Sequence, residues 1–532
     1  MNKPTHRFTL LLAVVAALGS VLFFPHIATA TPTWTDDTQI TANGATTNQA
    51  PLFLSGSDGS ITAITVETVS STYSVLARRS IDGGVTWGAP TVLSASGVAS
   101  ADATVVKLNN GHFAVAFAEA SGTSGVNQIR LVTSSNNGLT WGSAQTISTA
   151  GGAAHAATHP HLAAFGTTEL VVGFQQSDGA HDRAIVRYSQ SQLQSWTQGQ
   201  TLSASGSDAR FVTPVVNTSG DIVVSWILVA SDTTQQTQIA GSSNWSTVTT
   251  LTSNAVAGVP HVPAVVALPT GAFVVLWADP DLNPSYTVTA RISSNAGLAW
   301  DVGIPISSTA FPNEITAVVT ADGGIAAAWS MGTGGYTYIQ TSYSSPTSTP
   351  SPSPSASPSS SSSASPWPTT TGAGSAWSTP LNISPSVTGQ FYTNPQLALS
   401  PDGKVAMVLK QNVSSTFATG SSVSTDNGAT WPQGVQSITS WQSSPTSISS
   451  VSLVALTGQG FIYGWQTTLN GNPDKGFVRV YGWEASSSSS STPAPTLPAT
   501  GSVLWATGLL SIAFFGSGLI FWAVTARSRA RR

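Results

Sequence analysis

The 532-residue chain contains no cysteine, and only 8% of its residues are charged. The lack of cysteine excludes disulfides, thiolate metal ligands and cysteine nucleophiles. A net charge of −4 gives the chain no basic field that would attract nucleic acid. We therefore predict neither a nucleic-acid partner nor a bound cofactor. Stability must come from packing, to which the 17 tryptophans can contribute large buried areas.

The N-terminus has the pattern of an export signal. A positive segment, an apolar run and a small-residue cleavage site follow one another as Lys3 and Arg7, Phe8 to Phe24, and Ala28-Thr29-Ala30. This order is typical of a secretory signal peptide. We predict a signal peptide over residues 1–30; a retained membrane anchor is the alternative.

Three features follow one another at the C-terminus. The motif Leu497-Pro498-Ala499-Thr500-Gly501 precedes an apolar segment over 503–526 and a basic tail over 527–532. The apolar segment is long enough to cross a bilayer as a helix, and the arginines of the tail would stay in the cytoplasm. The combination resembles the sorting signal of sortase substrates from Gram-positive-type bacteria. The resemblance implies cleavage between Thr500 and Gly501 by a sortase and covalent transfer to peptidoglycan; a plain single-pass membrane anchor is the alternative.

Between these ends, four segments repeat one pattern. In each, Ser is followed by Asp or Asn, Gly, usually Thr, and Trp. The four copies contain Ser80, Asp82, Gly84, Thr86 and Trp87; Ser134, Asn136, Gly138, Thr140 and Trp141; Ser293, Asn295, Gly297 and Trp300; and Ser424, Asp426, Gly428, Thr430 and Trp431. They resemble the Asp-box of sialidases and related propellers. The pattern suits a tight turn in which Asp or Asn caps backbone N–H groups and Gly adopts a positive φ. We predict a structural role for these turns, without an ion.

Tryptophans continue the same period where the box itself is lost. The series Trp34, Trp87, Trp141, Trp196, Trp245, Trp300, Trp377 and Trp431 has spacings of 53, 54, 55, 49, 55, 77 and 54 residues. The long spacing contains the Ser/Pro-rich segment 344–375, whose composition cannot form a core. Each unit reads as four short strands, which is the pattern of a propeller blade.

We predict an all-β protein, a β-propeller of four-stranded antiparallel blades with terminal apolar helices. Residues 31–343 would form blades 1–6, and residues 376–485 further repeats, with a Ser/Thr/Pro stalk over 486–496. The segment from Trp34 to Ile40 would be an orphan fourth strand that closes the ring. We predict eight blades, by closure on the unit ending near Trp483; the alternative, closure on the unit ending at Tyr343, gives six, as in sialidases, plus two extra repeats.

The resemblance to sialidases implies a specific active site. It requires three arginines that hold a carboxylate, a Tyr–Glu nucleophile pair and an Asp acid/base. Gln49 stands where the first arginine is expected, and a neutral amide cannot replace a guanidinium. Arg79, Arg130, Arg187, Arg291 and Arg479 recur on third strands, away from the axis, whereas Arg183 and Arg210 are predicted in loops. Tyr188, Tyr286, Tyr336, Tyr338 and Tyr392 have no evident partner among the inner-strand acids Glu67, Glu119, Glu169 and Glu314.

His155, His159 and His161 lie close together in the sequence before the third blade. Such a group is a weak candidate for a metal site, because metal binding needs imidazoles that converge on one ion. A polar loop, or contact with a ligand at the central opening, is the alternative. We predict no metal.

These features favour a cell-wall-anchored surface protein that displays a sialidase-like propeller. Its role would be adhesion, through binding of an extracellular glycan or of a host or matrix protein. The alternative is an extracellular sialidase or other glycoside hydrolase, and a third possibility is a display scaffold. Because the sequence contains neither a clear arginine triad nor a clear Tyr–Glu pair, a binding protein is favoured over an enzyme.

Overall fold

The structure is a computed structural model, and it describes residues 34–482 with gaps. The gaps are residues 122–124, 149–154, 191, 232–233, 243–244, 246, 253–261, 280–285, 308–310, 346–376, 415, 440–441, 444–446, 458–459 and 469–473. The predicted signal peptide, stalk, sorting motif, transmembrane segment and terminal helices lie outside the described residues. No helix within the described ranges is long and apolar enough to span a membrane.

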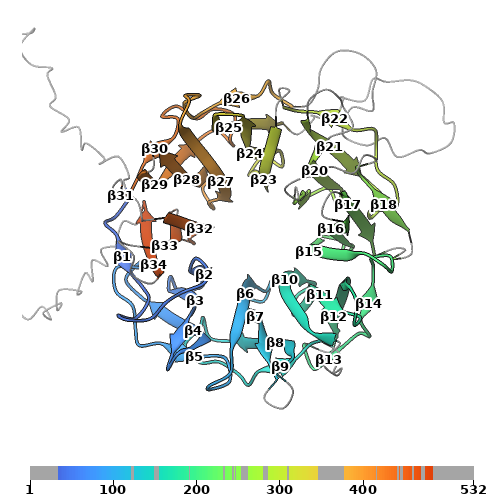
Figure 1. Ribbon diagram of the computed structural model, residues 1–532, viewed down its shortest axis with the longest axis vertical. Coiled ribbons are helices and arrows are strands. Elements are labelled where there is room, and N and C mark those ends of the chain that lie inside the picture. Colours follow the sequence, from blue (N-terminus) through green and yellow to red (C-terminus); the bar gives the residue numbers. More distant parts are fainter. Residues whose placement is uncertain are drawn as a thin grey trace, which may run out of the picture. The chain divides into compact units, whose positions relative to one another are not determined.

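The strands form eight antiparallel blades arranged around one axis (Figure 1). Blade 1 contains β2 (Leu52–Ser55), β3 (Ile61–Val69), β4 (Thr72–Ser80) and β5 (Thr91–Val92), and blade 2 contains β6 (Ser100–Lys107), β7 (Phe113–Ala120), β8 (Asn127–Ser134) and β9 (Gln145–Thr146). Blade 3 contains β10 (Ala157–Phe165), β11 (Glu169–Ser177), β12 (Asp182–Gln190), β13 (Ser195–Trp196) and β14 (Gln200–Thr201), and blade 4 contains β15 (Asp208–Val216), β16 (Ile222–Ser231), β17 (Thr234–Gly241) and β18 (Val248–Thr250). Blade 5 contains β19 (Ala264–Ala267), β20 (Phe273–Asp279), β21 (Thr287–Ser293) and β22 (Ile304–Pro305), and blade 6 contains β23 (Phe311–Val319), β24 (Ile325–Thr333), β25 (Tyr336–Ser344) and β26 (Leu381–Asn382). Blade 7 contains β27 (Gln390–Leu399), β28 (Val405–Val413), β29 (Thr416–Ser424), β30 (Gln436–Ser437) and β31 (Gln442–Ser443), and blade 8 contains β32 (Ser447–Ala455), β33 (Phe461–Thr468), β34 (Lys475–Tyr481) and β1 (Thr38–Gln39).

The predicted propeller and its closure are confirmed. The strand β1 from the N-terminal side pairs with β34, with Thr38 opposite Val478, and completes blade 8. Figure 1 shows the blue β1 beside the red β34. The ring therefore closes on the last unit and has eight blades, so the six-bladed alternative is not adopted. Closure by pairing leaves no exposed sheet edge at the join.

Each tryptophan of the period packs between two neighbouring blades. Trp34 lies in a cluster with Val408 of blade 7 and Tyr463 of blade 8, and Trp141 lies in one with Val66 of blade 1. The other six occupy the remaining junctions: Trp87 (blades 8 and 1), Trp196 (2 and 3), Trp245 (3 and 4), Trp300 (4 and 5), Trp377 (5 and 6) and Trp431 (6 and 7). The period of the sequence thus counts the blade junctions.

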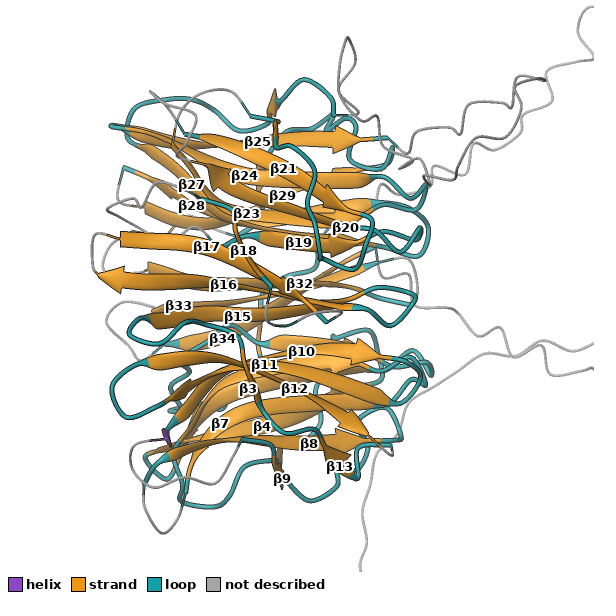
Figure 2. Cartoon of the chain, turned by 90° about the vertical axis from the view of Figure 1, so that its right-hand side faces the viewer, coloured by secondary structure: helices purple, strands orange, loops and turns teal. Residues whose placement is uncertain are grey.

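The innermost strand of every blade starts at the same end of the ring, which we call the upper rim. The box turns connect third and fourth strands, so they lie at the opposite end, the lower rim. Seen from the side, the strands run between these two ends (Figure 2). The last described residue, Gly482, follows β34 and lies at the lower rim. The described residues belong to one compact unit.

The box turns have a shared hydrogen-bond pattern. In blade 1, the Ser80 Oγ accepts from the Gly84 N–H at 2.8 Å, and the Asp82 Oδ1 accepts from the Thr86 N–H at 2.9 Å. Gly84 has a φ of +91°, which only glycine adopts without cost. Asn136, Asn295 and Asp426 accept the equivalent bond at 2.9 Å each. Asn therefore serves here as well as Asp, because the backbone bond uses one side-chain oxygen and the Asn136 amide can donate to the Thr140 hydroxyl at 2.8 Å.

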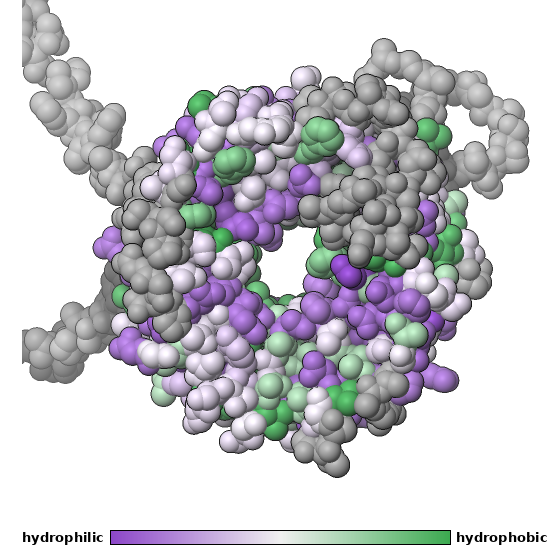
Figure 3. Space-filling view, in the orientation of Figure 1, coloured by the Kyte–Doolittle hydropathy of each residue, from purple (hydrophilic) through white to green (hydrophobic). Residues whose placement is uncertain are grey.

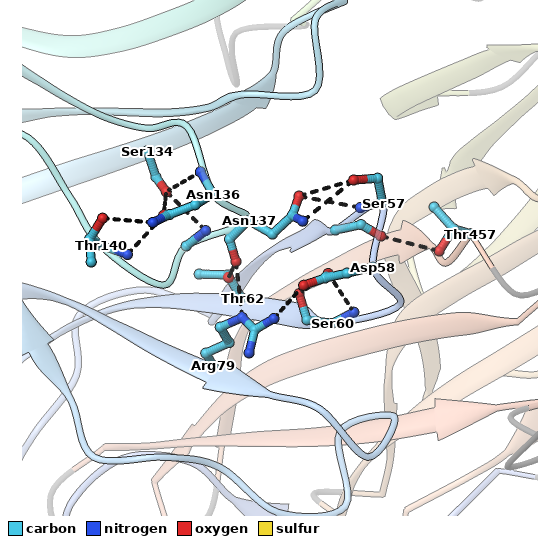
Figure 4. Close-up of polar contacts among 12 residues, drawn as sticks. Ser57, Asp58, Ser60, Thr62, Arg79, Ser134, Asn136, Asn137, Thr140 and Thr457 are labelled. Carbon is cyan, nitrogen blue, oxygen red and sulfur yellow. Dashed lines mark hydrogen bonds and ion pairs between the residues drawn. The ribbon is translucent and has the colours of Figure 1, made fainter. Parts of the chain in front are cut away.

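The box turn of blade 2 also binds blade 1 (Figure 4). The backbone carbonyl of Asn137 accepts from the Arg79 Nε at 3.2 Å. The Asn137 side-chain oxygen accepts from the Ser57 N–H at 3.3 Å. Arg79 pairs in turn with Asp58 in the first turn of its own blade. This arginine of a third strand therefore joins two blades at the lower rim, far from the start of the innermost strands.

The Ser/Pro-rich segment interrupts blade 6 between its third and fourth strands. Trp377 forms an antiparallel bridge with Ser344, and β26 pairs with β25. Residues paired in this way have Cα atoms only about 5 Å apart, so the two ends of the segment are adjacent.

Replacing residues 346–376 by Asn-Gly is therefore expected to preserve the ring. Shortening the loop between Ser344 and Trp377 about elevenfold removes roughly 2 kcal/mol of closure entropy, so the free energy of unfolding should stay equal or rise by up to that amount. Urea unfolding of the two chains measures the difference. A loss above about 1 kcal/mol would show that the segment contributes to the fold, since surface changes stay within roughly 0.5 kcal/mol.

Candidate functional site

The axis of the ring is lined by innermost strands that share a β-bulge. Five blades place a non-glycine residue with positive φ at this bulge: Asp102 (53°), His159 (50°), Phe211 (56°), Glu314 (50°) and Asn394 (57°). Such a conformation costs on the order of 1–3 kcal/mol and persists only when its surroundings impose it. The structure shows what imposes it at several of these bulges.

Side chains near the axis bind the bulge of the next blade. The Asp102 Oδ2 of blade 2 accepts from the His159 N–H of blade 3 at 3.3 Å. The Glu314 carboxylate of blade 6 accepts from the Asn394 N–H of blade 7, and from the Ser330 hydroxyl at 3.1 Å. Glu314, one of the acids that sequence alone places among the catalytic candidates, and Asp102 are thus both hydrogen-bonded to backbone. Figure 3 shows that the opening on the axis stays unfilled, with hydrophilic residues along much of its border.

Gln49 has the same role between blades 1 and 2. Its Nε2 donates to the Ala103 carbonyl at 3.2 Å, and its Oε1 accepts from the Ala103 N–H at 3.0 Å. Arginine has no acceptor and could not make the second bond. The position expected to hold a sialidase arginine is therefore used to join two blades.

An arginine triad at the axis is not formed by the described residues. Seven of the eight described arginines lie on third strands: Arg78, Arg79, Arg130, Arg183, Arg187, Arg291 and Arg479. Arg210, on β15, is the exception. The prediction of loops for Arg183 and Arg210 was wrong, because both lie within strands, β12 and β15. Arg183 donates to Ser203 and pairs with Asp178 at 3.0 Å, which holds it away from the axis.

The second-strand acids are also engaged. Glu67 forms a buried ion pair with Arg78, and its Oε2 accepts from the Ala42 N–H at 2.9 Å. Glu119 repeats this arrangement with Arg130 at 3.2 Å and with the Ala95 N–H at 2.6 Å. Each acid therefore hydrogen-bonds the segment that precedes the first strand of its own blade, at Ala42 and at Ala95.

Glu169 and the candidate tyrosines have other partners. The Glu169 Oε2 accepts from the Ser189 hydroxyl at 2.6 Å. The Tyr392 hydroxyl donates to Gln390 at 3.1 Å, and burial raises the pKa of that phenol. The other four tyrosines lie beside aromatic rings: Tyr188 with Phe165, Tyr286 with Phe311, and Tyr336 with Tyr338. These contacts assign Tyr188, Tyr336, Tyr338 and Tyr392 to packing, while Tyr286 lies beside the exposed ring of Phe311.

A charged cluster lies at the upper rim of blades 3 and 4. The Asp208 Oδ1 accepts from the Asp182 N–H at 3.0 Å and lies 3.2 Å from the His181 Nδ1. Burial and the neighbouring Asp208 raise the pKa of Asp182, while His159 and Arg210 oppose the shift. Asp182 and Asp208 could not be recognised as a pair from the sequence, because 26 residues separate them in the chain.

The three histidines are not assembled around a common point. The His155 Nδ1 lies 3.2 Å from the Ser177 carbonyl, whereas His159 faces Asp102 at 3.7 Å. Within the described residues, no three His, Asp or Glu side chains could hold a metal ion. Burial lowers the pKa of His161 to about 4, with a further contribution from His159 and an opposing one from Asp102.

His161 should make the propeller sensitive to mild acid. Its folded-state pKa of about 4 lies below the ordinary value of 6.5, so the unfolded chain binds the proton more tightly between these values. The contribution of neutral His161 to the free energy of unfolding is then fully present above pH 6.5, and it is lost as the pH falls towards 4. We expect a loss of about 2 kcal/mol after allowance for the partial exposure of the ring. Urea unfolding at pH 7.5 and 4.5 should show this loss in the native chain and not in His161→Gln; equal losses would contradict the assignment.

The chain is similar to several solved structures at low sequence identity. No protein-family model and no curated protein matches the sequence. Similar solved structures include a Penicillium chrysogenum α-L-arabinanase complexed with arabinobiose, 14% identical over 74% of this chain and 98% of that chain, with a TM-score of 0.39. A Hadza microbial sialidase is 13% identical over 53% of this chain and 63% of that chain, with a TM-score of 0.33. An ulvan lyase is 8% identical over 81% of this chain and 93% of that chain, with a TM-score of 0.45.

Proposed function

We propose that this chain is an exported, cell-wall-anchored surface protein whose propeller binds an extracellular glycan. The observation that carries the binding role is the use of the polar side chains near the axis. Gln49, Asp102 and Glu314 each hydrogen-bond the backbone of the next blade, and the described arginines form no triad there. Such a ring can present a ligand surface, while the chemistry of a sialidase has no complete set of groups.

The sequence of the two ends supports the location. The cleavage site near Thr31 would release the chain outside the cell, and a sortase would join Thr500 to a peptidoglycan precursor. The described chain ends at Gly482, at the lower rim.

Two experiments test this proposal. The propeller, residues 31–485, should bind members of a glycan array and show no turnover of a fluorogenic sialoside. In a host that carries a sortase, the full chain should be recovered in the cell-wall fraction, and Thr500→Ala should shift it to the membrane fraction. Sialoside turnover would overturn the binding role, and wall attachment that survives Thr500→Ala would overturn the anchoring mechanism.

A second candidate function rests on Asp182. The Asp182 carboxyl is exposed at the upper rim beside Asp208, and its raised pKa is in the direction expected of a glycosidase acid. If the chain hydrolyses a glycoside, Asp182→Asn should reduce kcat by about 100-fold or more, in line with the loss of a general acid. The control Asp178→Asn removes a nearby carboxyl that Arg183 already engages. Equal activity in Asp182→Asn would exclude this role.

A further inference from the structure

Three phenylalanines at the upper rim of blades 6 and 7 are not used by the hydrophobic core. Phe311 and Phe391 are 54% and 39% exposed, and Phe417 is half-buried. None of the three belongs to a core cluster, whereas Phe53 and Phe174, for example, do. Exposed aromatic rings that gather at one place commonly mark a binding surface.

The strand register places these rings in one row. Phe391 lies opposite Asn412, which lies opposite Phe417 on the next strand. On the other side, Phe391 is paired with Thr337, and Thr337 is joined to Phe311 through Gly332. With neighbouring strands about 4.8 Å apart, the backbones at Phe391 and Phe417 are roughly 10 Å apart, and those at Phe311 and Phe391 about 14 Å.

A hydrogen-bonding group stands between two of the rings. Directly opposite residues of an antiparallel pair have their side chains on the same face, so the Asn412 amide lies between Phe391 and Phe417. This half-exposed amide makes no hydrogen bond within the part of the chain that the structure describes. An unpaired amide beside exposed rings offers both a donor and an acceptor to a ligand.

The charges around the row are few and are already engaged. The Glu314 carboxylate accepts from the Ser330 hydroxyl and from the backbone of blade 7. The Lys410 ammonium, on the same strand as Asn412, donates to the Ser449 carbonyl at 3.3 Å. One acid and one base leave no net field of either sign, so a charged ligand gains little here. Tyr286 extends the aromatic surface beside Phe311, with ring centroids 5.3 Å apart.

We propose that this row binds an unbranched neutral glycan of rings with equatorial substituents. The flat C–H faces of such rings stack on Phe311, Phe391 and Phe417, while a hydroxyl at their edge bonds the Asn412 amide. Alternating apolar faces and polar edges match the alternating phenyl and amide groups of the row. The inference rests on the proposed glycan-binding function and names its site and ligand class.

Isothermal titration calorimetry and saturation-transfer NMR on residues 31–485 test the row with three probes. Cellopentaose and chitopentaose are neutral and unbranched, and 3′-sialyllactose is anionic. We expect binding of at least one neutral probe and about tenfold weaker binding in Phe391→Ala, the size of one lost aromatic contact. Asn412→Ala should weaken it similarly, and Phe391→Trp should retain it.

The control is Ile81→Ala, which removes an exposed apolar side chain at the lower rim and should leave affinity unchanged. Thermal unfolding of each variant verifies that the ring remains folded. If neither neutral probe binds, or only 3′-sialyllactose does, the proposal that this row binds a neutral glycan is contradicted. If a neutral probe binds equally to Phe391→Ala and Phe311→Ala, glycan binding stands but this site is wrong.

Discussion

Replacing Trp34 by alanine should lower the free energy of unfolding by about 3–5 kcal/mol, the range for a large aromatic removed from a packed site. The Trp34 indole donates to the Ser421 Oγ of blade 7 at 2.8 Å. Its ring meets the Tyr463 ring of blade 8 edge to face, with centroids 4.9 Å apart. It therefore fills the junction at which the chain closes on itself, and its loss leaves a cavity and an unpaired hydroxyl.

Urea unfolding of Trp34→Ala measures this effect. Trp34→Phe keeps most of the ring contact and should recover about half of the loss, while the exposed Ile81→Ala should change stability by roughly 0.5 kcal/mol or less. Deleting residues 34–41 should go further and produce an open, aggregating ring, because the edge of β34 is then unpaired. A loss below about 1 kcal/mol in Trp34→Ala would show that this junction contributes little.

Removing the Glu67 side chain should cost about 3–5 kcal/mol, because it leaves a buried charge without its partner. The side chains of Glu67 and Arg78 are only 1% and 6% exposed. Glu67 also accepts from the Thr65 hydroxyl at 2.7 Å and from the Ala42 N–H, so Glu67→Ala leaves several buried donors unsatisfied. The expected result is a large fall in the urea midpoint.

Two further chains give this prediction its controls. The double variant Glu67→Met/Arg78→Met removes both charges and should recover much of the stability, since apolar replacements of similar size often substitute for buried pairs. Asp58→Ala breaks the exposed pair with Arg79 and should cost less than about 1 kcal/mol. If Glu67→Ala and Asp58→Ala lose the same amount, burial is not what gives the Glu67 pair its effect.

The tryptophan period was sufficient to predict the ring, and the reason is physical. Each ring fills one junction between blades, so counting from Trp34 to Trp431 counts junctions, whether or not the box is intact. The choice between six and eight blades also followed from packing. Trp377 and β26 complete blade 6 across the Ser/Pro-rich segment, which left no two-blade remainder.

The candidate site was far less predictable. Positive φ at Asp102 has no signature in composition, because the side chain that holds its bulge, Gln49, comes from the preceding blade. The sequence did contain one clue: Pro160 and Pro395 directly follow bulge residues. The partners that explain Gln49, Asp102 and Asp182 lie 54, 57 and 26 residues away, beyond the reach of local patterns.

The row of phenylalanines was missed for a related reason. Phe311 and Phe391 begin strands that otherwise read as core strands, so nothing in the local pattern separates them from buried residues. Only the register across blades 6 and 7 shows that they share a row with Asn412 and are left outside the core.

Engineered disulfides test the closure of the eight-bladed ring most directly, since the chain has no cysteine of its own. Thr38 lies opposite Val478 in the closing pair, at a separation that a disulfide can span. Thr38→Cys/Val478→Cys should therefore form an intramolecular link that peptide mass spectrometry identifies, and Thr38→Cys/Thr341→Cys should not. A link between positions 38 and 341 would mean that β1 completes blade 6 in place of β26, which contradicts the eight-bladed ring.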